Sequence, residues 1–183
     1  MALFPDELPW LSKPAAVAET VSVIAASALR ARCPAEEVGE GSPARLLDGL
    51  AHRDRALPAG SFVFLVSDFL SAAGNAWADA LACRWDIVPV LVQDPTWEQS
   101  FPDVAGAVLP VSDPRTGRLR LARITRADVR ERRRENEARL DALLESFRQT
   151  GLDWVLISSS APSAVLEAFL AWAYVRERGR RAR

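Results

Sequence analysis

The chain has few of the side chains that most often build metal centres and catalytic sites. It contains one histidine, His52, and two cysteines, Cys33 and Cys83, which lie far apart. A zinc site or a disulfide framework needs more such ligands at closer spacing, so the sequence argues against both. We therefore expect the two cysteines to be small packing residues.

An excess of one charge and long apolar runs are also missing. The 23 basic and 24 acidic side chains nearly cancel, so the overall charge gives no reason to expect binding to nucleic acid or to a membrane. No stretch approaches the roughly 18 apolar residues of a membrane span, and the N-terminus lacks the pattern of a signal peptide. We expect no membrane segment in this chain and a cytoplasmic location.

The sequence does have the composition of a globular domain with a parallel sheet. Its 183 residues are 49% hydrophobic and 26% charged, which is enough for one domain with a sizeable core. Three apolar runs, at 62–67, 87–92 and 153–158, have no polar alternation, and each precedes a helical pattern. Such runs predict strands buried on both faces of a mostly parallel α/β sheet flanked by helices. Pro89 lacks a backbone donor, so it must lie at an edge or a local irregularity.

Capping residues and apolar spacing predict the helices. We expect helices over about 14–32, with Ser12 as N-cap, from 43 to 50, over 69–84 as a crossover, over 126–150 and from Pro162 onward. Thr125 precedes the fourth helix, and Asp128 stands where the acid of a capping box would lie. Segments 107–111 and 118–124 flank a turn and predict a β-hairpin. The expected domains are an N-terminal arm (1–13), a single domain (14–178) and a basic tail (179–183).

Polar residues follow each predicted strand. Ser67 and Asp68 follow the first, Asp94 and then Trp97 follow the second, and Ser158 and Ser159 follow the third. Because the carboxyl ends of parallel strands share one edge, we expect these six residues to form a rim that binds a partner. An alternative is that Asp68 and Asp94 only cap the helices that follow them, and that Trp97 only covers the sheet edge.

The ordered series of segments resembles a known family. The run GSFVFLVSDFL at 60–70 resembles the fourth strand of von Willebrand factor A-like domains, in which an apolar strand ends in an Asp of a metal-binding site. With RWDIVPVLVQDPTWEQSFPDVAGAVLPVSDPRTGR and DWVLISSS, the chain is similar to the bacterial domain of unknown function 58 family over about 57–172. The resemblance implies a von Willebrand A-like, Rossmann-like three-layer sandwich.

The same resemblance implies a divalent cation that this chain is poorly equipped to hold. The family pattern has a first strand ending in Asp-x-Ser-x-Ser, followed by a threonine-bearing loop, and the chain contains no Asp-x-Ser-x-Ser. Asp68 is the one metal ligand that carries over, and a hard cation needs several oxygen ligands. We expect a shortened family member with a degenerate site, in which Mg²⁺ would be the only candidate cofactor.

Three functional readings remain after this comparison. The first, implied by the resemblance, is a non-enzymatic adaptor or chaperone-like component that binds a MoxR-type AAA+ ATPase. The alternative is a Mg-dependent phosphoryl or phosphodiester hydrolase that uses Asp68 and Asp94, although the chain lacks a Walker loop and a glycine-rich phosphate cradle. The third, nucleic-acid binding through the arginines of 130–134 and 176–183, is disfavoured because glutamates alternate with the helical arginines.

Overall fold

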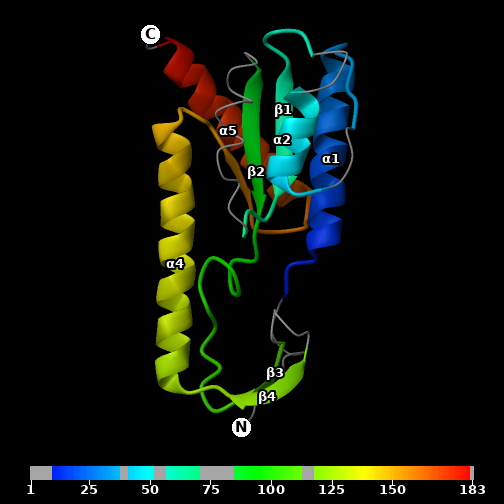
Figure 1. The fold of residues 1–183 in the computed structure, drawn as a ribbon. Helices are drawn as coiled ribbons and strands as arrows, with labels where there is room; N and C mark the ends of the chain where they lie inside the picture. The colour runs from blue at the N-terminus through cyan, green and yellow to red at the C-terminus, as the bar shows by residue number, and fades with distance from the viewer. Residues whose placement is uncertain (1–9, 38–40, 52–56, 71–84, 113–117, 182–183) are drawn as a thin grey trace. The chain divides into compact units, whose positions relative to one another are not determined.

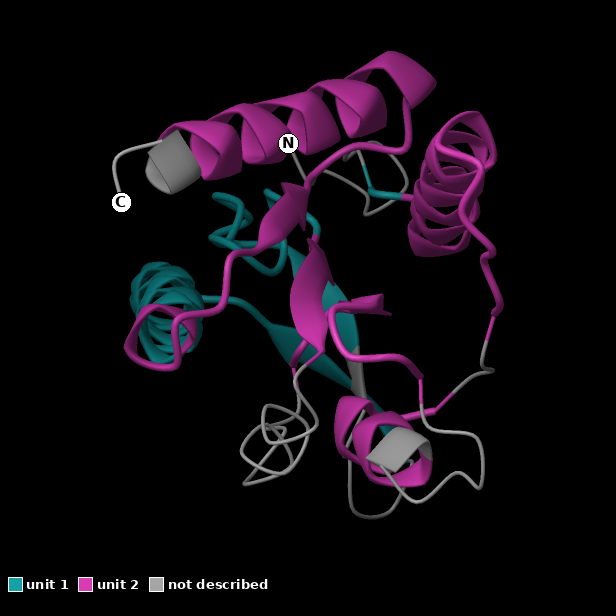
Figure 2. Cartoon of the chain, turned by 90° about the horizontal axis from the view of Figure 1, so that it is seen from above, with its two compact units in different colours: residues 1–11, 94–146 teal, residues 12–93, 147–183 magenta. Residues whose placement is uncertain are grey.

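The computed structural model describes residues 10–37, 41–51, 57–70, 85–112 and 118–181. The chain divides into two compact units (Figure 2), each described by itself below. Unit 1 comprises residues 1–11 and 94–146, and unit 2 comprises residues 12–93 and 147–183.

Unit 2 is built on a parallel sheet. Its strands are β1 (Phe62–Ser67), β2 (Asp86–Val92) and β5 (Val155–Ile157), in the order β1-β2-β5. Both pairings are parallel, and Ser67 pairs with Leu91 while Ile157 pairs with Val92. Every residue from Ile87 to Val92 is buried, as a continuous apolar run requires. The structure confirms the predicted α/β class with a parallel sheet.

Pro89 explains why strand β5 is shorter than the strand that the sequence predicts over 153–158. The backbone N–H of Asp86 donates to the carbonyl of Ser61 beside β1, whereas that of Gln93 donates to the carbonyl of Ile157 in β5. Successive residues of a strand bond to alternate neighbours, so the nitrogen of Pro89 faces the β5 side. Pairing with β5 begins one residue later, at Val90. The proline therefore lies where no ladder bond is formed, although β2 is the central strand.

Helices cover both faces of this sheet (Figure 1). α2 (Pro43–Ala51) and α5 (Pro162–Arg181) lie on opposite faces. Phe62 and Phe64 of β1 meet Trp172 of α5 edge to face, with ring centroids 6.4 and 6.0 Å apart. Sheet and helices together form the Rossmann-like α/β sandwich expected from the sequence.

α1 (Lys13–Arg30) confirms the first predicted helix. Ser12 occupies the N-cap position without a side-chain capping bond. Ala16 and Thr20 are fully buried, whereas Val17 is 38% exposed. α1 contacts α5 and β2, and small side chains at this face allow close approach of the helix.

Unit 1 contains the predicted hairpin and most of the longest helix. β3 (Val108–Ser112) and β4 (Leu119–Arg123) pair antiparallel, and α4 (Arg126–Gln149) follows. Val104, Ala107 and Val129 form a small buried cluster under the hairpin. Thr125 and Asp128 form the predicted capping box: the Thr125 N–H donates to Asp128 Oδ2 at 2.8 Å and the Asp128 N–H to Thr125 Oγ1 at 3.2 Å.

Three other expectations have mixed outcomes. The predicted crossover helix at 69–84 falls mostly outside the described residues, as does Cys83. Cys33 is exposed, so its prediction as a core residue is wrong; it follows the last turn of α1, where Arg32 takes a left-handed conformation. Among the described helices, none combines the length and the apolar character that crossing a membrane requires.

Candidate functional site

The turn after β1 is held by its own side chains. The N–H of Phe69 donates to Ser67 Oγ at 3.1 Å, and the N–H of Leu70 donates to Asp68 Oδ1 at 3.2 Å. Phe69 has a φ of +51°, which is uncommon for a bulky residue. Its ring is buried and meets Phe147 edge to face at 5.7 Å. Packing of this ring stabilises a backbone conformation that is otherwise unfavourable.

Asp68 also forms an ion pair with the only lysine of the chain. Lys13 Nζ lies 2.9 Å from Asp68 Oδ2, and the two side chains are 34% and 36% exposed. Lys13 is the first residue of α1, so the pair connects the start of that helix to the end of β1. No local pattern predicts this contact, since the two residues are 55 positions apart.

Gln93 links the ends of all three strands. It follows β2 directly, and its Nε2 donates to the carbonyl of Asp68 at 2.6 Å beyond β1. Its backbone N–H donates to the carbonyl of Ile157 in β5 at 3.1 Å. The side chain is 1% exposed. A polar residue at the end of a continuous apolar strand was the available signal for this role, which the sequence interpretation missed.

Ser158 and Ser159 lie at the same edge as Ser67 and Asp68. β1 and β5 flank β2, so their ends are separated by two strand spacings, about 9.5 Å. Both serines are half-buried, and the N–H of Ala161 donates to Ser159 Oγ at 3.1 Å ahead of α5. The structure thus brings four of the six predicted rim residues to one sheet edge in unit 2; that they bind a partner stays a prediction.

Asp94 belongs to unit 1 and is an acceptor for the backbone. Its Oδ1 accepts hydrogen bonds from the N–H groups of Thr96 at 2.8 Å and Trp97 at 2.9 Å. Its Oδ2 accepts from the N–H of Leu11 at 2.6 Å. The residue is 4% exposed. These bonds are of the capping kind that the sequence interpretation kept as an alternative, but they close a turn at 95–98 and not the start of a helix.

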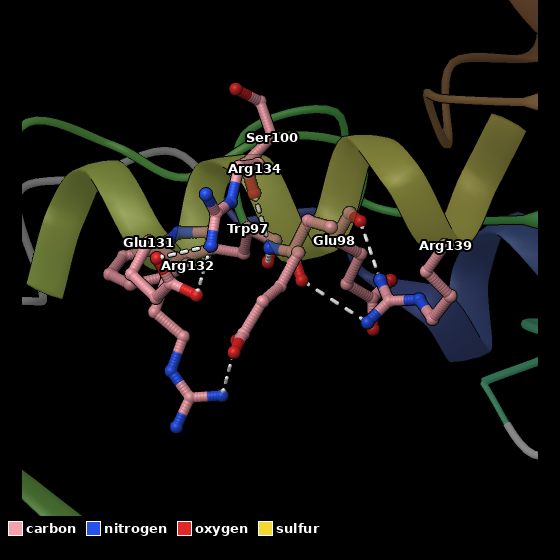
Figure 3. Close-up of polar contacts among 9 residues, drawn as sticks. Trp97, Glu98, Ser100, Glu131, Arg132, Arg134 and Arg139 are labelled. Atoms are coloured by element: carbon pink, nitrogen blue, oxygen red, sulfur yellow. Dashed lines mark hydrogen bonds and ion pairs between the residues drawn. The ribbon is translucent and has the colours of Figure 1, made fainter.

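Trp97 stacks on Trp10, with ring centroids 4.2 Å apart and planes 6° from parallel. Its backbone carbonyl accepts from Asn136 Nδ2 at 3.0 Å, and Arg139 of the same helix donates to the carbonyl of Glu98 at 2.6 Å (Figure 3). α4 therefore holds the segment that carries Trp97 through backbone carbonyls. Although Trp10 stacks on Trp97, it remains 58% exposed.

The residues at the sheet edge do not fit a divalent-cation site. Asp68 Oδ2 is ion-paired with an ammonium group, and Oδ1 accepts a backbone N–H. Over the part of the chain that the structure describes, no group of three His, Cys, Asp or Glu side chains gathers closely enough to hold a metal ion. A hard cation would need several oxygen ligands here. The ammonium group of Lys13 lies beside Asp68, the one carboxylate that the resemblance offers as a metal ligand.

Comparison with known proteins gives one match. No curated protein and no solved structure matches the chain. Residues 14–142, well over half of the chain, match the family described as "Protein of unknown function DUF58". The matched residues include the series of segments at 60–118 on which the resemblance rests. The chain belongs to the DUF58 family.

Proposed function

We propose that this chain is a non-enzymatic protein-interaction module, an adaptor or chaperone-like component that works with a MoxR-type AAA+ ATPase in the bacterial cytoplasm. The partner class comes from the resemblance of the chain to the von Willebrand A-like pattern of the family. Contact with the partner would involve the sheet edge with Ser67, Asp68, Ser158 and Ser159, and in unit 1 Asp94 and Trp97.

The observation that carries the proposal is the bonding of the two strand-end carboxylates. Asp68 is paired with Lys13 and Leu70, and the carboxylate of Asp94 accepts three backbone N–H groups. A hydrolase using Asp68 and Asp94 would need these oxygens for Mg²⁺ or for a water molecule. Their present partners position backbone segments, which suits a binding scaffold better than catalysis.

The proposal is tested by direct binding of the full chain to the purified MoxR-type ATPase of the same genome. We expect saturable binding by the wild-type chain and weaker binding by Asp68→Ala. Glu167→Ala is the matched control, because Glu167 is an exposed acid on α5. Absence of binding by the wild-type chain would overturn the adaptor role. Equal binding by wild type and Asp68→Ala would remove Asp68 from the contact surface.

A further inference from the structure

The β3–β4 hairpin has apolar side chains on both faces. Leu109 lies on the inner face and packs, together with Ile124 beyond the end of β4, against the cluster of Val104, Ala107 and Val129. The register pairs Pro110 with Leu121, so both point to the opposite side from Leu109. This opposite side, the outer face, carries the apolar residues Val108, Pro110, Leu119 and Leu121, and it also carries Arg123, which the register places opposite Val108.

The outer face is highly exposed. Val108 is 54%, Leu119 73% and Leu121 75% exposed, and Pro110 is exposed as well. Single exposed apolar residues are ordinary on a protein surface, but adjacent ones on paired strands form a contiguous patch. Because the inner face already supplies the packing that holds the hairpin, the outer leucines are not required for the small core below.

Unpaired arginines border this face. Residues 118–134 contain eight arginines and two acids. Arg132 and Arg134 pair with Glu135 and Glu131, and Arg133 donates to the carbonyl of Phe101 (Figure 3 shows the first two). Four further arginines are exposed and form no ion pair among the described residues: Arg120, Arg123, Arg126 and Arg130. The hairpin and the start of α4 therefore carry uncompensated positive charge.

We propose that the outer face docks into an apolar site ringed by Asp and Glu on a protein partner. This inference rests on the proposed function and assigns the contact to the MoxR-type ATPase. The charge requires an acidic rim, and the leucines require an apolar centre. Nucleic acid would match the arginines but would leave the leucines without partners. A membrane surface would need several basic groups on the side of the leucines, whereas within the paired strands Arg123 alone lies on that side and Arg120 points to the other side by strand alternation.

The test compares two matched pairs of exposed leucines in the full chain. The double variant Leu119→Thr/Leu121→Thr removes the apolar centre and keeps β propensity. The control is Leu166→Gln/Leu170→Gln on α5, at residues 47% and 59% exposed. We expect about tenfold weaker binding to the ATPase for the hairpin variant and wild-type binding for the control. Unchanged circular dichroism and melting temperature in both variants would confirm that the fold is kept.

The contribution of the arginines is tested separately, by the salt dependence of binding. Arg120→Gln/Arg123→Gln is expected to weaken binding several-fold in about 50 mM salt and to flatten the salt dependence. If the wild-type chain binds the ATPase and the hairpin variants bind equally well, this inference is wrong and the adaptor role stands. If the wild-type chain binds only anionic vesicles or a single-stranded oligonucleotide, both proposals fail.

Discussion

Asp68 and Asp94 are the same residue type in the same sequence position, just after a parallel strand, yet they have different environments. Asp68 is half-exposed and paired with a lysine, whereas Asp94 is buried and surrounded by backbone donors. A strand-end pattern predicts that a carboxylate lies at the sheet edge, but not which donors reach it. Besides local backbone N–H groups, one donor to each carboxylate is distant in sequence: Lys13 lies 55 positions from Asp68, and Leu11 lies 83 positions from Asp94.

At the level of single residues, we expect Lys13 and Asp68 to be energetically coupled. Lys13→Met and Asp68→Asn should each destabilise the fold slightly, and the double variant should lose less than the sum. The coupling should be about 0.5–1 kcal/mol, since both side chains are about one-third exposed. Urea unfolding of the four proteins measures it, and the coupling should shrink in high salt.

The same variants test the metal interpretation. If the ammonium is the cation that balances Asp68, millimolar Mg²⁺ should leave the melting temperature of the wild-type chain unchanged, because a ligand raises stability only when it binds the folded state. A rise that disappears in Asp68→Asn would contradict this view.

At the level of elements, the start of α4 should respond to acid. The side-chain hydrogen bond from Thr125 and then its backbone hydrogen bond hold the pKa of Asp128 below its ordinary value of 3.8; burial opposes them, and the charge of Arg132 contributes least to the lowering. A lowered pKa means that the ionised carboxylate stabilises the folded state above the pKa of the unfolded chain. This contribution is lost as the pH falls through the folded-state pKa.

We therefore expect the stability difference between wild type and Asp128→Asn to be constant near neutral pH and to shrink below about pH 4. Urea unfolding at a series of pH values measures this difference. Asp141→Asn, an exposed acid farther along the same helix, serves as the control. A difference that stays constant into strong acid would show that the carboxylate charge does not support the cap.

Arg176 of α5 connects the beginnings of β2 and β5, where the backbones of the two strands are not paired. Its guanidinium pairs with Asp86 at the start of β2 and with Asp153, at 3.3 Å, ahead of β5. It also lies over the rings of Phe62 and Trp172 at 5.3 and 5.4 Å from their centroids. Pro89 has no backbone N–H to donate toward β5. The side chain of Arg176 therefore joins β2 and β5 at this end of the sheet.

The expected result for Arg176→Met is a loss of about 2–3 kcal/mol in the free energy of unfolding, because two carboxylates lose an ion pair and the arginine is only 16% exposed. Arg176→Lys should recover part of it, since an ammonium cannot reproduce the planar fork of a guanidinium. Denaturant unfolding measures both, with Arg45→Met as an exposed control. Equal stability of Arg176→Met and wild type would refute this bridging role.

The elements themselves were largely predictable, because their signals are local. Continuous apolar runs gave the strands, and Thr125 with Asp128 gave the start of α4. The length of β5 was not predictable, because it depends on the side to which the nitrogen of Pro89 points. The outward apolar face of the hairpin was also missed, since alternation predicts two faces but does not say which one meets the core.

At the level of the whole molecule, the division into two units was not apparent from the sequence. Residues 94–146 form unit 1 with the N-terminal residues, and the chain then returns to unit 2 to complete the sheet with β5. Local periodicity contains no information about such a return. The near-zero net charge was equally uninformative, because it averages over a strongly basic stretch at 118–134.

The scarcity of lysine has a practical consequence for the edge of the sheet. Lys13 carries the only side-chain amine of the chain, so reductive methylation with ¹³C-formaldehyde would label one side chain besides the terminal amine. The resonance of that methylated amine would come from a group 2.9 Å from Asp68 Oδ2. Nuclear magnetic resonance could then follow, at one atom, how this edge responds when a partner protein is added.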